Sequence, residues 1–356
     1  MEVKTSRINL GSFNLIKGVA MMLVVLGHMI WLYDMDQVKI LYPLFFLLKM
    51  TSAPLMPLFL TISGYGLKEK APKKMLKMTF KSLVVPYLWV AAIFYPIFVI
   101  ATWIGYGSLP WGFELANRYL IAFLLGIPKE GHMIAGIEVR HNTAVWFFLA
   151  LFIALNLLNL IIKCKKPAQR ISLVIVCILA GYFLVLRGID YYCIPQGLMA
   201  VGCCYVGYLL KKFNLLERGF TSGRPYLVLV PLFLIQGCFG KLNLATGEFQ
   251  WGLLDYFAAI GSALLLLDVS LKADRFEGKV MNFIREIGAY SYWILCIHSV
   301  EETCMQWWLF AEIMPNQLLA CFCELLLKIL ILTAGCAILK KISQKKYRRR
   351  MLQYAK

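Results

Sequence analysis

The stretch Val19-Ala-Met-Met-Leu-Val-Val-Leu-Gly-His-Met-Ile-Trp-Leu-Tyr33 is apolar enough to lie in a lipid bilayer, and His28 is its only side chain that titrates near neutral pH. An ionisable group at membrane depth is costly, so it usually faces the interior of a helix bundle and serves a function. The stretch therefore predicts a membrane helix that carries a functional histidine. The alternative is a histidine that only hydrogen-bonds a neighbouring helix.

The whole chain has the composition of a polytopic membrane protein. Of its 356 residues, 60% are hydrophobic and 16% are charged, and the mean hydropathy is +0.70. Soluble domains carry about a quarter charged residues. We expect an all-α transmembrane bundle that forms a single domain over residues 1–356, with a basic cytoplasmic tail at 340–356 and no further sizeable soluble domain.

Ten apolar segments approach the length of about 20 residues that crosses a bilayer. They are residues 16–33, 40–66, 83–104, 143–162, 171–187, 193–210, 225–241, 252–271, 287–310 and 317–339. The N-terminus resembles a secretory signal peptide, because basic residues precede an apolar run. No small-x-small cleavage site follows Tyr33, so we expect the first segment to remain as an uncleaved membrane helix.

The basic residues predict the orientation of these spans. With the N-terminus inside, the inner segments carry 29 of the 37 lysines and arginines and the outer segments carry 6. Basic residues concentrate in cytoplasmic loops, so both termini are expected in the cytoplasm. The net charge of +18 is explained by topology and by contact with membrane lipid, and we expect no nucleic-acid partner.

The eleven cysteines mostly fall inside apolar runs. Cys321 and Cys323 are two residues apart, but no second pair and no nearby histidine completes a zinc pattern. The cysteines are typical of small buried apolar residues, and we expect neither a disulfide framework nor a metal.

Two further groups of polar residues are candidates for chemistry in the membrane. His298 is followed by Glu301 and Glu302 at spacings that share one helical face, where a carboxylate can orient a base or relay a proton. The carboxylates could instead sit among lipid headgroups. Glu324 and Lys328 are four apart, which predicts an internally neutralised pair.

Asp34 lies six residues after His28, and six residues turn a helix by about 600°. The two side chains therefore do not share a face. Asp34 can become a partner of His28 only if the helix ends and the chain folds back. Otherwise it anchors the helix at the membrane interface.

The longest outer segment, residues 105–142, contains Arg140 and His141 and is expected to form a short interfacial helix over 115–127. In the second span, Pro54 and Pro57 precede Ser63, and prolines and glycines there predict a bent helix beside a cavity. A simple packing kink is the alternative.

One segment, expected as an inner loop, is crowded with lysines: Lys68, Lys70, Lys73, Lys74, Lys77 and Lys81. Topology and anionic lipid explain such a cluster. It could also dock a phosphorylated donor, because an ammonium group binds phosphate as a point charge.

Four elements, in order, resemble the acyltransferase-3 family of integral membrane acyltransferases. They are residues 14–20 running into Leu23-Val-Val-Leu-Gly-His28, Met56-Pro-Leu-Phe-Leu-Thr-Ile-Ser-Gly-Tyr65, Trp146-Phe-Phe-Leu149 and Ser291-Tyr-Trp-Ile-Leu-Cys-Ile-His298. The resemblance implies a ten-helix bundle in the cell membrane. It also implies transfer of an acyl group, commonly acetyl from acetyl-CoA, to a hydroxyl of a cell-envelope sugar or small molecule.

Mapped onto this sequence, the family's first-helix catalytic histidine is His28. Many members carry an R-x-x-R pair before a proline at the third helix. Here Pro86 is preceded by Lys77 and Lys81, and lysine lacks the bidentate fork of arginine.

These features predict an O-acyltransferase. The acetyl-CoA donor enters from the cytoplasmic side near Lys74, Lys77 and Lys81. His28 acts as general base or carries the acyl group, and His298, with Glu302, orients it or relays protons.

The acceptor is expected at Arg140, His141, Trp146 and Ser63. A proton-coupled solute transporter is the rival prediction, because a buried histidine and bent helices suit a carrier equally well. An inactive envelope scaffold is a third.

Overall fold

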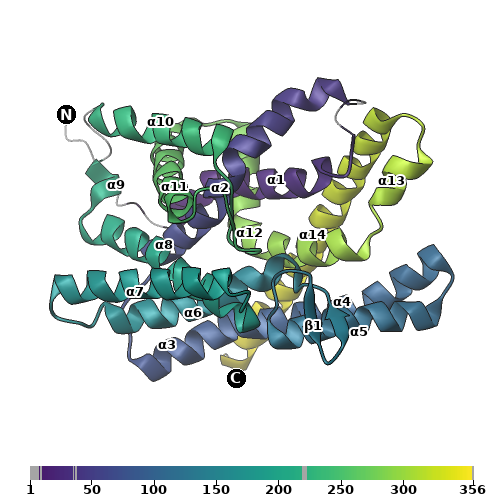
Figure 1. Cartoon of the computed structure of the whole chain (residues 1–356), viewed down its shortest axis with the longest axis horizontal. Coiled ribbons are helices and arrows are strands. Elements are labelled where there is room, and N and C mark those ends of the chain that lie inside the picture. The colour runs from purple at the N-terminus through teal and green to yellow at the C-terminus, as the bar shows by residue number, and fades with distance from the viewer. Residues whose placement is uncertain (1–7, 9, 35, 37, 219–222, 355–356) are drawn as a thin grey trace.

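The computed structural model describes residues 8, 10–34, 36, 38–218 and 223–354, with only the backbone described for 342–354. The predicted all-α membrane bundle is confirmed. Helices make up most of the described chain, and the only strands in that part form two short antiparallel hairpins, β1–β2 and β3–β4 (Figure 1).

The helices and strands follow one another in this order: η1 (Leu10–Phe13), α1 (Asn14–Ile30), η2 (Lys39–Leu41), α2 (Tyr42–Tyr65), α3 (Pro72–Thr79), η3 (Phe80–Val84), α4 (Val85–Tyr106), α5 (Leu109–Leu125), β1 (His132–Ile134), β2 (Ile137–Val139), η4 (Thr143–Val145), α6 (Trp146–Ile161), α7 (Pro167–Leu186), η5 (Tyr191–Cys193), α8 (Ile194–Lys212), α9 (Leu215–Arg218), α10 (Arg224–Phe239), β3 (Leu242–Asn243), β4 (Glu248–Phe249), α11 (Leu253–Ala273), α12 (Lys279–Cys304), α13 (Trp308–Ile313) and α14 (Gln317–Tyr354).

Each of the ten predicted membrane segments contains a helix, and the predicted segment 287–310 is divided between α12 and α13. Within the described residues, eight helices are long and apolar enough to cross a membrane by length and composition. The other two predicted segments correspond to α10 and α12. Helix α10 has 16 residues, and α12 has 26 residues but is too polar to count as a membrane span by composition. Polar residues are expected in a helix that faces a cavity rather than lipid.

The lysine-rich segment differs from the predicted inner loop. Helix is continuous from Pro72 to Tyr106, with a π-helical turn, η3, between α3 and α4. Proline at the first position and the helix-forming lysines, methionines and leucine that follow explain why this segment is helical. Short π segments are frequent at functional sites.

The predicted interfacial helix of the outer segment is α5, which begins earlier than expected. The hydroxyl of Ser108 accepts a hydrogen bond from the backbone N–H of Trp111 and caps the helix at that point. In Figure 1, α5, β1 and α13 lie at the right of the molecule, whereas α3 and α9 lie at the left. The two ends of the bundle therefore carry different connecting elements.

Helices α1 and α12 pack with their backbones in close contact. A Cβ atom added to Gly18 would lie 2.0 Å from the carbonyl oxygen of Ile284, and one added to Gly288 would lie 1.8 Å from the carbonyl oxygen of Asn14. Small residues allow this approach between membrane helices. This contact joins the start of α1 to the tenth residue of α12, and further along the same two helices His28 and His298 also meet.

The close contact gives a first prediction. Gly288→Ala should destabilise the protein by about 1–3 kcal/mol, because the added methyl group pushes against backbone atoms. On helix propensity alone, the same change should stabilise by about 1 kcal/mol. The measurement is thermal unfolding of the purified protein in detergent, followed by circular dichroism.

Gly27→Ala is the matched control, since a Cβ at Gly27 meets nothing within 4 Å. It should leave the unfolding temperature unchanged or raise it. Equal stability of the two variants would show that the α1–α12 contact tolerates a side chain.

Candidate functional site

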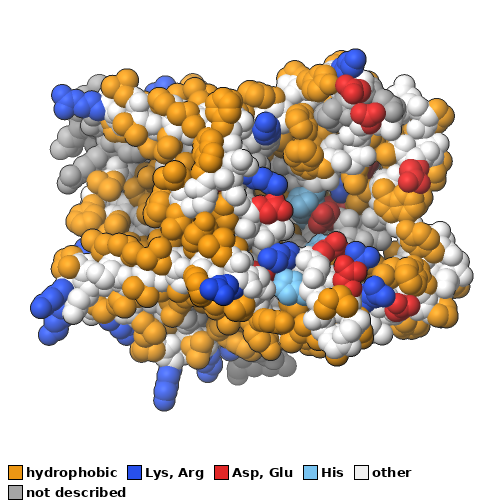
Figure 2. Space-filling model, in the orientation of Figure 1, with side chains coloured by type: hydrophobic (Ala, Val, Ile, Leu, Met, Phe, Trp, Pro, Cys, Tyr) orange, Lys and Arg blue, Asp and Glu red, His pale blue; other side chains and the backbone are white. Residues whose placement is uncertain are grey.

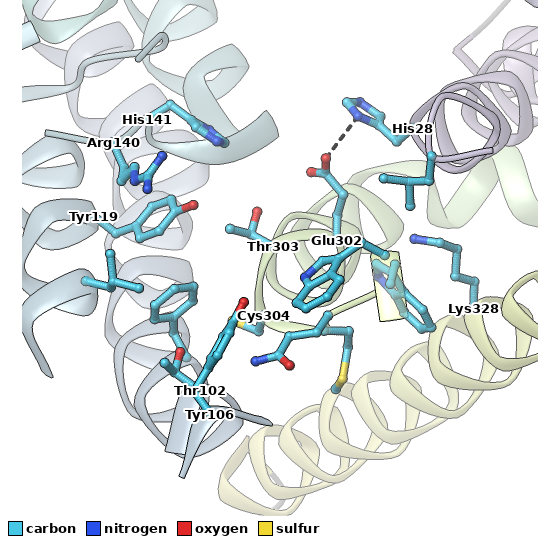
Figure 3. A pocket seen from close by; sticks show the side chains of 17 residues that line it. His28, Thr102, Tyr106, Tyr119, Arg140, His141, Glu302, Thr303, Cys304 and Lys328 are labelled. Carbon is cyan, nitrogen blue, oxygen red and sulfur yellow. Dashed lines mark ion pairs between the residues drawn. The ribbon is translucent and has the colours of Figure 1, made fainter. Parts of the chain in front are cut away.

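A cavity of about 400 Å³ opens between α1, α4, α5, α12 and α14. Figure 2 shows charged and histidine side chains gathered in a hollow on this face, amid largely hydrophobic surface. Figure 3 shows the lining side chains. They are His28, Leu32, Phe98, Thr102, Tyr106, Leu115, Tyr119, Arg140, His141, Glu302, Thr303, Cys304, Met305, Gln306, Trp307, Trp308 and Lys328.

His28 lies in the last turn of α1 and points into this cavity. Its Nδ1 atom is 3.0 Å from Oε1 of Glu302 on α12, and its side chain is 44% exposed (Figure 3). The predicted placement of His28 beside a polar chamber agrees with this geometry. The partner is Glu302 from the other end of the chain.

Asp34 is not that partner. Its backbone N–H donates to Oε1 of Gln317 at the start of α14, and its carboxylate accepts from the N–H of Asp36. The chain after α1 turns toward the start of α14. The structure therefore does not show the pairing with His28, and the interface role stays a prediction.

His298 is completely buried in α12, next to His28. The two imidazole rings are edge-to-face with centroids 5.3 Å apart. Nδ1 of His298 lies 2.6 Å from Oε1 of Glu301, so its carboxylate partner is Glu301. The two adjacent glutamates contact different histidines, since Glu302 faces His28 and Glu301 faces His298. The prediction that His298 and Glu302 orient His28 or relay protons stays a prediction.

A chain of buried polar contacts continues from Glu301 to α14. Nζ of Lys328 lies 3.3 Å from Oε2 of Glu301 and 3.5 Å from Oε1 of Glu324. Tyr33 donates a hydrogen bond of 2.7 Å to Oε2 of Glu324. The predicted pair of Glu324 and Lys328 is present. Lys328 also contacts Glu301, the carboxylate that holds His298.

Arg140 and His141 form the opposite wall of the cavity, across from Glu302 (Figure 3). The guanidinium of Arg140 is 3.0 Å from Oε1 of Glu130. Nδ1 of His141 accepts the backbone N–H of Thr143, and burial lowers the pKa of His141. The ring is therefore neutral near pH 7 and carries its proton on Nε2, which makes that atom a hydrogen-bond donor.

Two residues predicted to bind the acceptor do not line the cavity. Ser63 donates its hydroxyl proton to the carbonyl oxygen of Phe59 within α2. Trp146 is buried at the start of α6, edge-to-face with Phe147. The structure does not bring these two side chains to this cavity, and their contact with an acceptor stays a prediction.

The predicted donor lysines lie apart from the histidines. Lys77 and Lys81 line a separate groove of about 340 Å³, together with Lys73, Leu76 and Phe80. Lys74 is exposed on α3 and does not line this groove. The histidine cavity and the lysine groove share no lining residue.

Several cavity residues carry no signal in the sequence. Tyr106, Trp307 and Trp308 resemble aromatic anchors at a membrane interface, although they line the cavity. Thr102 and Gln306 are inconspicuous in apolar surroundings. Glu301, which does not line the cavity, does carry a signal, since its spacing of three from His298 marks it as a neighbour.

The arrangement can accept and pass protons. A histidine whose Nδ1 faces a carboxylate has its other ring nitrogen available as a proton acceptor. His28 has this geometry and faces the cavity. Donors on the opposite wall can hold a bound oxygen or an anionic group.

The comparisons with known proteins agree with this chemistry. Residues 10–340 match the family model Acyl_transf_3, described as an acyltransferase domain. No curated protein and no solved structure matches the chain. Because the match covers nearly the whole chain, the protein belongs to this family, and it is a multi-pass membrane acyltransferase.

The buried polar chain gives a second prediction. Lys328→Met should lower stability by about 3–5 kcal/mol, because it leaves two buried carboxylates without their cation. Thermal unfolding in detergent is the measurement. Adding Glu301→Gln to this variant should restore part of the loss, as expected for coupled residues.

Lys340→Met is the matched control. Lys340 lies 3.8 Å from Glu286 in an exposed pair, and exposed pairs contribute little. If both lysine variants unfold at the temperature of the unmodified protein, Lys328 does not neutralise the buried carboxylates.

Proposed function

We propose that this acyltransferase transfers an acetyl group from acetyl-CoA, bound on the cytoplasmic side of the cell membrane, to a hydroxyl group of a cell-envelope carbohydrate or small molecule. The observation that carries the proposal is the pair of His28 and Glu302, open to a polar cavity opposite Arg140 and His141. Acyl transfer needs a proton acceptor and donors for a developing oxyanion, and this cavity contains both types of group.

In the proposed reaction, Glu302 holds the proton on Nδ1 of His28, and Nε2 removes the proton of the acceptor hydroxyl. The acceptor oxygen attacks the thioester carbonyl, a C–O bond forms, and the C–S bond breaks. The leaving thiolate takes the proton from the imidazolium of His28. His298, held by Glu301, packs edge-to-face on His28 and fixes its ring.

Arg140 and His141 bind the acceptor in this proposal. A guanidinium and a neutral imidazole N–H supply donors for hydroxyl or carbonyl oxygens. Tyr106 and Trp308 stack with ring centroids 6.2 Å apart at the cavity, and such flat faces suit the apolar face of a sugar ring. The combination favours a polyhydroxylated acceptor over a lipid chain.

The donor's phosphates bind at Lys77 and Lys81 in this proposal. The continuous helix Pro72–Tyr106 begins at the lysine groove and ends at the histidine cavity, where Thr102 and Tyr106 line it. Because the groove and the cavity share no residue, the reaction requires an opening between the helices that separate them. The π-helical turn η3 lies at the lysine end of this helix.

The role of His28 gives a third prediction. His28→Ala should reduce acyl transfer by about 10²- to 10⁴-fold, because a general base contributes that much. The assay follows radiolabelled acetyl groups from acetyl-CoA into envelope carbohydrate, with mass spectrometry of the product. Expression and unfolding temperature should stay close to those of the unmodified protein.

His132→Ala is the matched control, because His132 lies in β1 beside Asp190 and outside the cavity. It should retain transfer. Unchanged transfer by His28→Ala would reject the assignment, and movement of solute into sealed vesicles with no acyl product would support a carrier instead.

The donor site gives a fourth prediction. Replacing both Lys77 and Lys81 by glutamine should raise KM for acetyl-CoA about tenfold, equivalent to ~1.4 kcal/mol, with kcat unchanged. The effect should weaken at high salt because charge attraction is screened. Lys241→Gln, in an exposed pair with Glu248, is the control, and an unchanged KM in the double variant would place the donor elsewhere.

A further inference from the structure

Three side chains of the cavity form a set of ligand atoms suitable for a metal ion. One ring nitrogen each of His28 and His298 and a carboxylate oxygen of Glu302 lie within 4.8 Å of one another. Two imidazoles and a carboxylate are a ligand set of zinc sites that keep one position open. The cysteine spacing predicts no metal, but these ligands come from α1 and α12, far apart in the sequence.

An unpartnered nitrogen is the second observation. His298 is 0% exposed, and its Nε2 atom has no hydrogen-bond partner. Its Nδ1 atom is held by Glu301 at 2.6 Å. A metal-binding histidine is typically arranged in this way, with the second nitrogen fixed by a carboxylate and the first left free for the ion.

The charges around the trio also favour a cation. Glu301, Glu302 and Glu324 are three carboxylates, and Lys328 is the ammonium group that contacts two of them. Arg140 and His141 face the same cavity from the far wall, but Arg140 is paired with Glu130. The formal charge of the three carboxylates and Lys328 is −2, which one divalent ion neutralises.

The site is also accessible. His28 is 44% exposed, and Glu302 lines the cavity beside it. An ion can therefore arrive through the cavity, and water can complete its coordination. Nitrogen-rich ligands favour zinc and related transition metals over magnesium or calcium.

We propose that His28, His298 and Glu302 bind one divalent transition-metal ion of the zinc class, and that this ion inhibits the enzyme. Coordination occupies the ring of His28 and the carboxylate that holds it, so the acceptor hydroxyl loses its proton acceptor. The inhibition rests on the proposed function. The binding of the ion does not.

The binding test uses the full-length protein, purified in detergent and washed with EDTA. The protein is incubated with zinc chloride and desalted, and its zinc content is measured by mass spectrometry. We expect one zinc per chain, and with cobalt(II) we expect the visible absorption bands of a four-coordinate site. Protein that retains no zinc and shows no cobalt bands would overturn the proposal.

Variants identify the ligands. His298→Ala and Glu302→Gln should lose the zinc, and Glu301→Gln should bind it about 10- to 100-fold more weakly. His141→Ala is the matched control, because His141 lines the same cavity but lies outside the trio. Zinc lost in His141→Ala and kept in Glu302→Gln would overturn the site. If His298→Ala does not fold, Glu301→Gln and Glu302→Gln decide the question.

The inhibition test adds zinc to the acyl-transfer assay. Transfer should fall as the site fills and return on addition of EDTA. Transfer that is unaffected by one bound zinc would overturn the inhibitory role. If His28→Ala keeps full transfer, the proposed function fails, while the zinc content of the unmodified protein still tests the metal site.

Discussion

The backbone contact between α1 and α12 is the constraint on which the candidate site depends. Gly18 and Gly288 let the two helices approach until only hydrogen atoms fit between them. A histidine at membrane depth needs a polar partner, and at this short separation Glu302 and His298 reach His28. If the two helices were further apart, His28 would face a gap or lipid. The glycine contact between the two helices therefore fixes the separation of the side chains at the cavity.

The polar chain from His298 to Tyr33 shows how a membrane bundle keeps charges in its interior. Burying ions costs several kcal/mol each unless every one is paired and hydrogen-bonded. Here Glu301 contacts both His298 and Lys328, and Glu324 contacts both Lys328 and Tyr33. Only 11% of the apolar part of α14 is buried inside the protein. The packing of α14 against the other helices therefore depends strongly on these polar contacts. The same network that holds α14 in place also fixes the orientation of His298.

Hydrophobicity and local spacing predicted the helices, the placement of His28 beside a polar cavity and the pair of Glu324 and Lys328. They could not predict which helices pack together, because glycine contacts such as Gly288 against Asn14 depend on the tertiary fold. Asp34 was a candidate partner of His28 through closeness in sequence, and the true partner, Glu302, lies almost at the other end of the chain. Ser63 and Trp146 belong to segments that resemble the family, but the structure uses both in helix packing. The lysine segment was expected as a loop because it is charged, although its residues are good helix formers.

The separation of the lysine groove from the histidine cavity has a physical consequence for acyl transfer. The phosphates of a coenzyme A donor carry charges that cannot enter the apolar core without partners. An acetyl group is small and neutral, so its passage between helices costs far less. In the proposed reaction, lysines at one end of the helix Pro72–Tyr106 hold the charged part of the donor, and the proton acceptor lies at the other end. With two separate sites, the charged phosphates stay at the lysine groove and only the neutral acetyl group has to reach the histidine cavity.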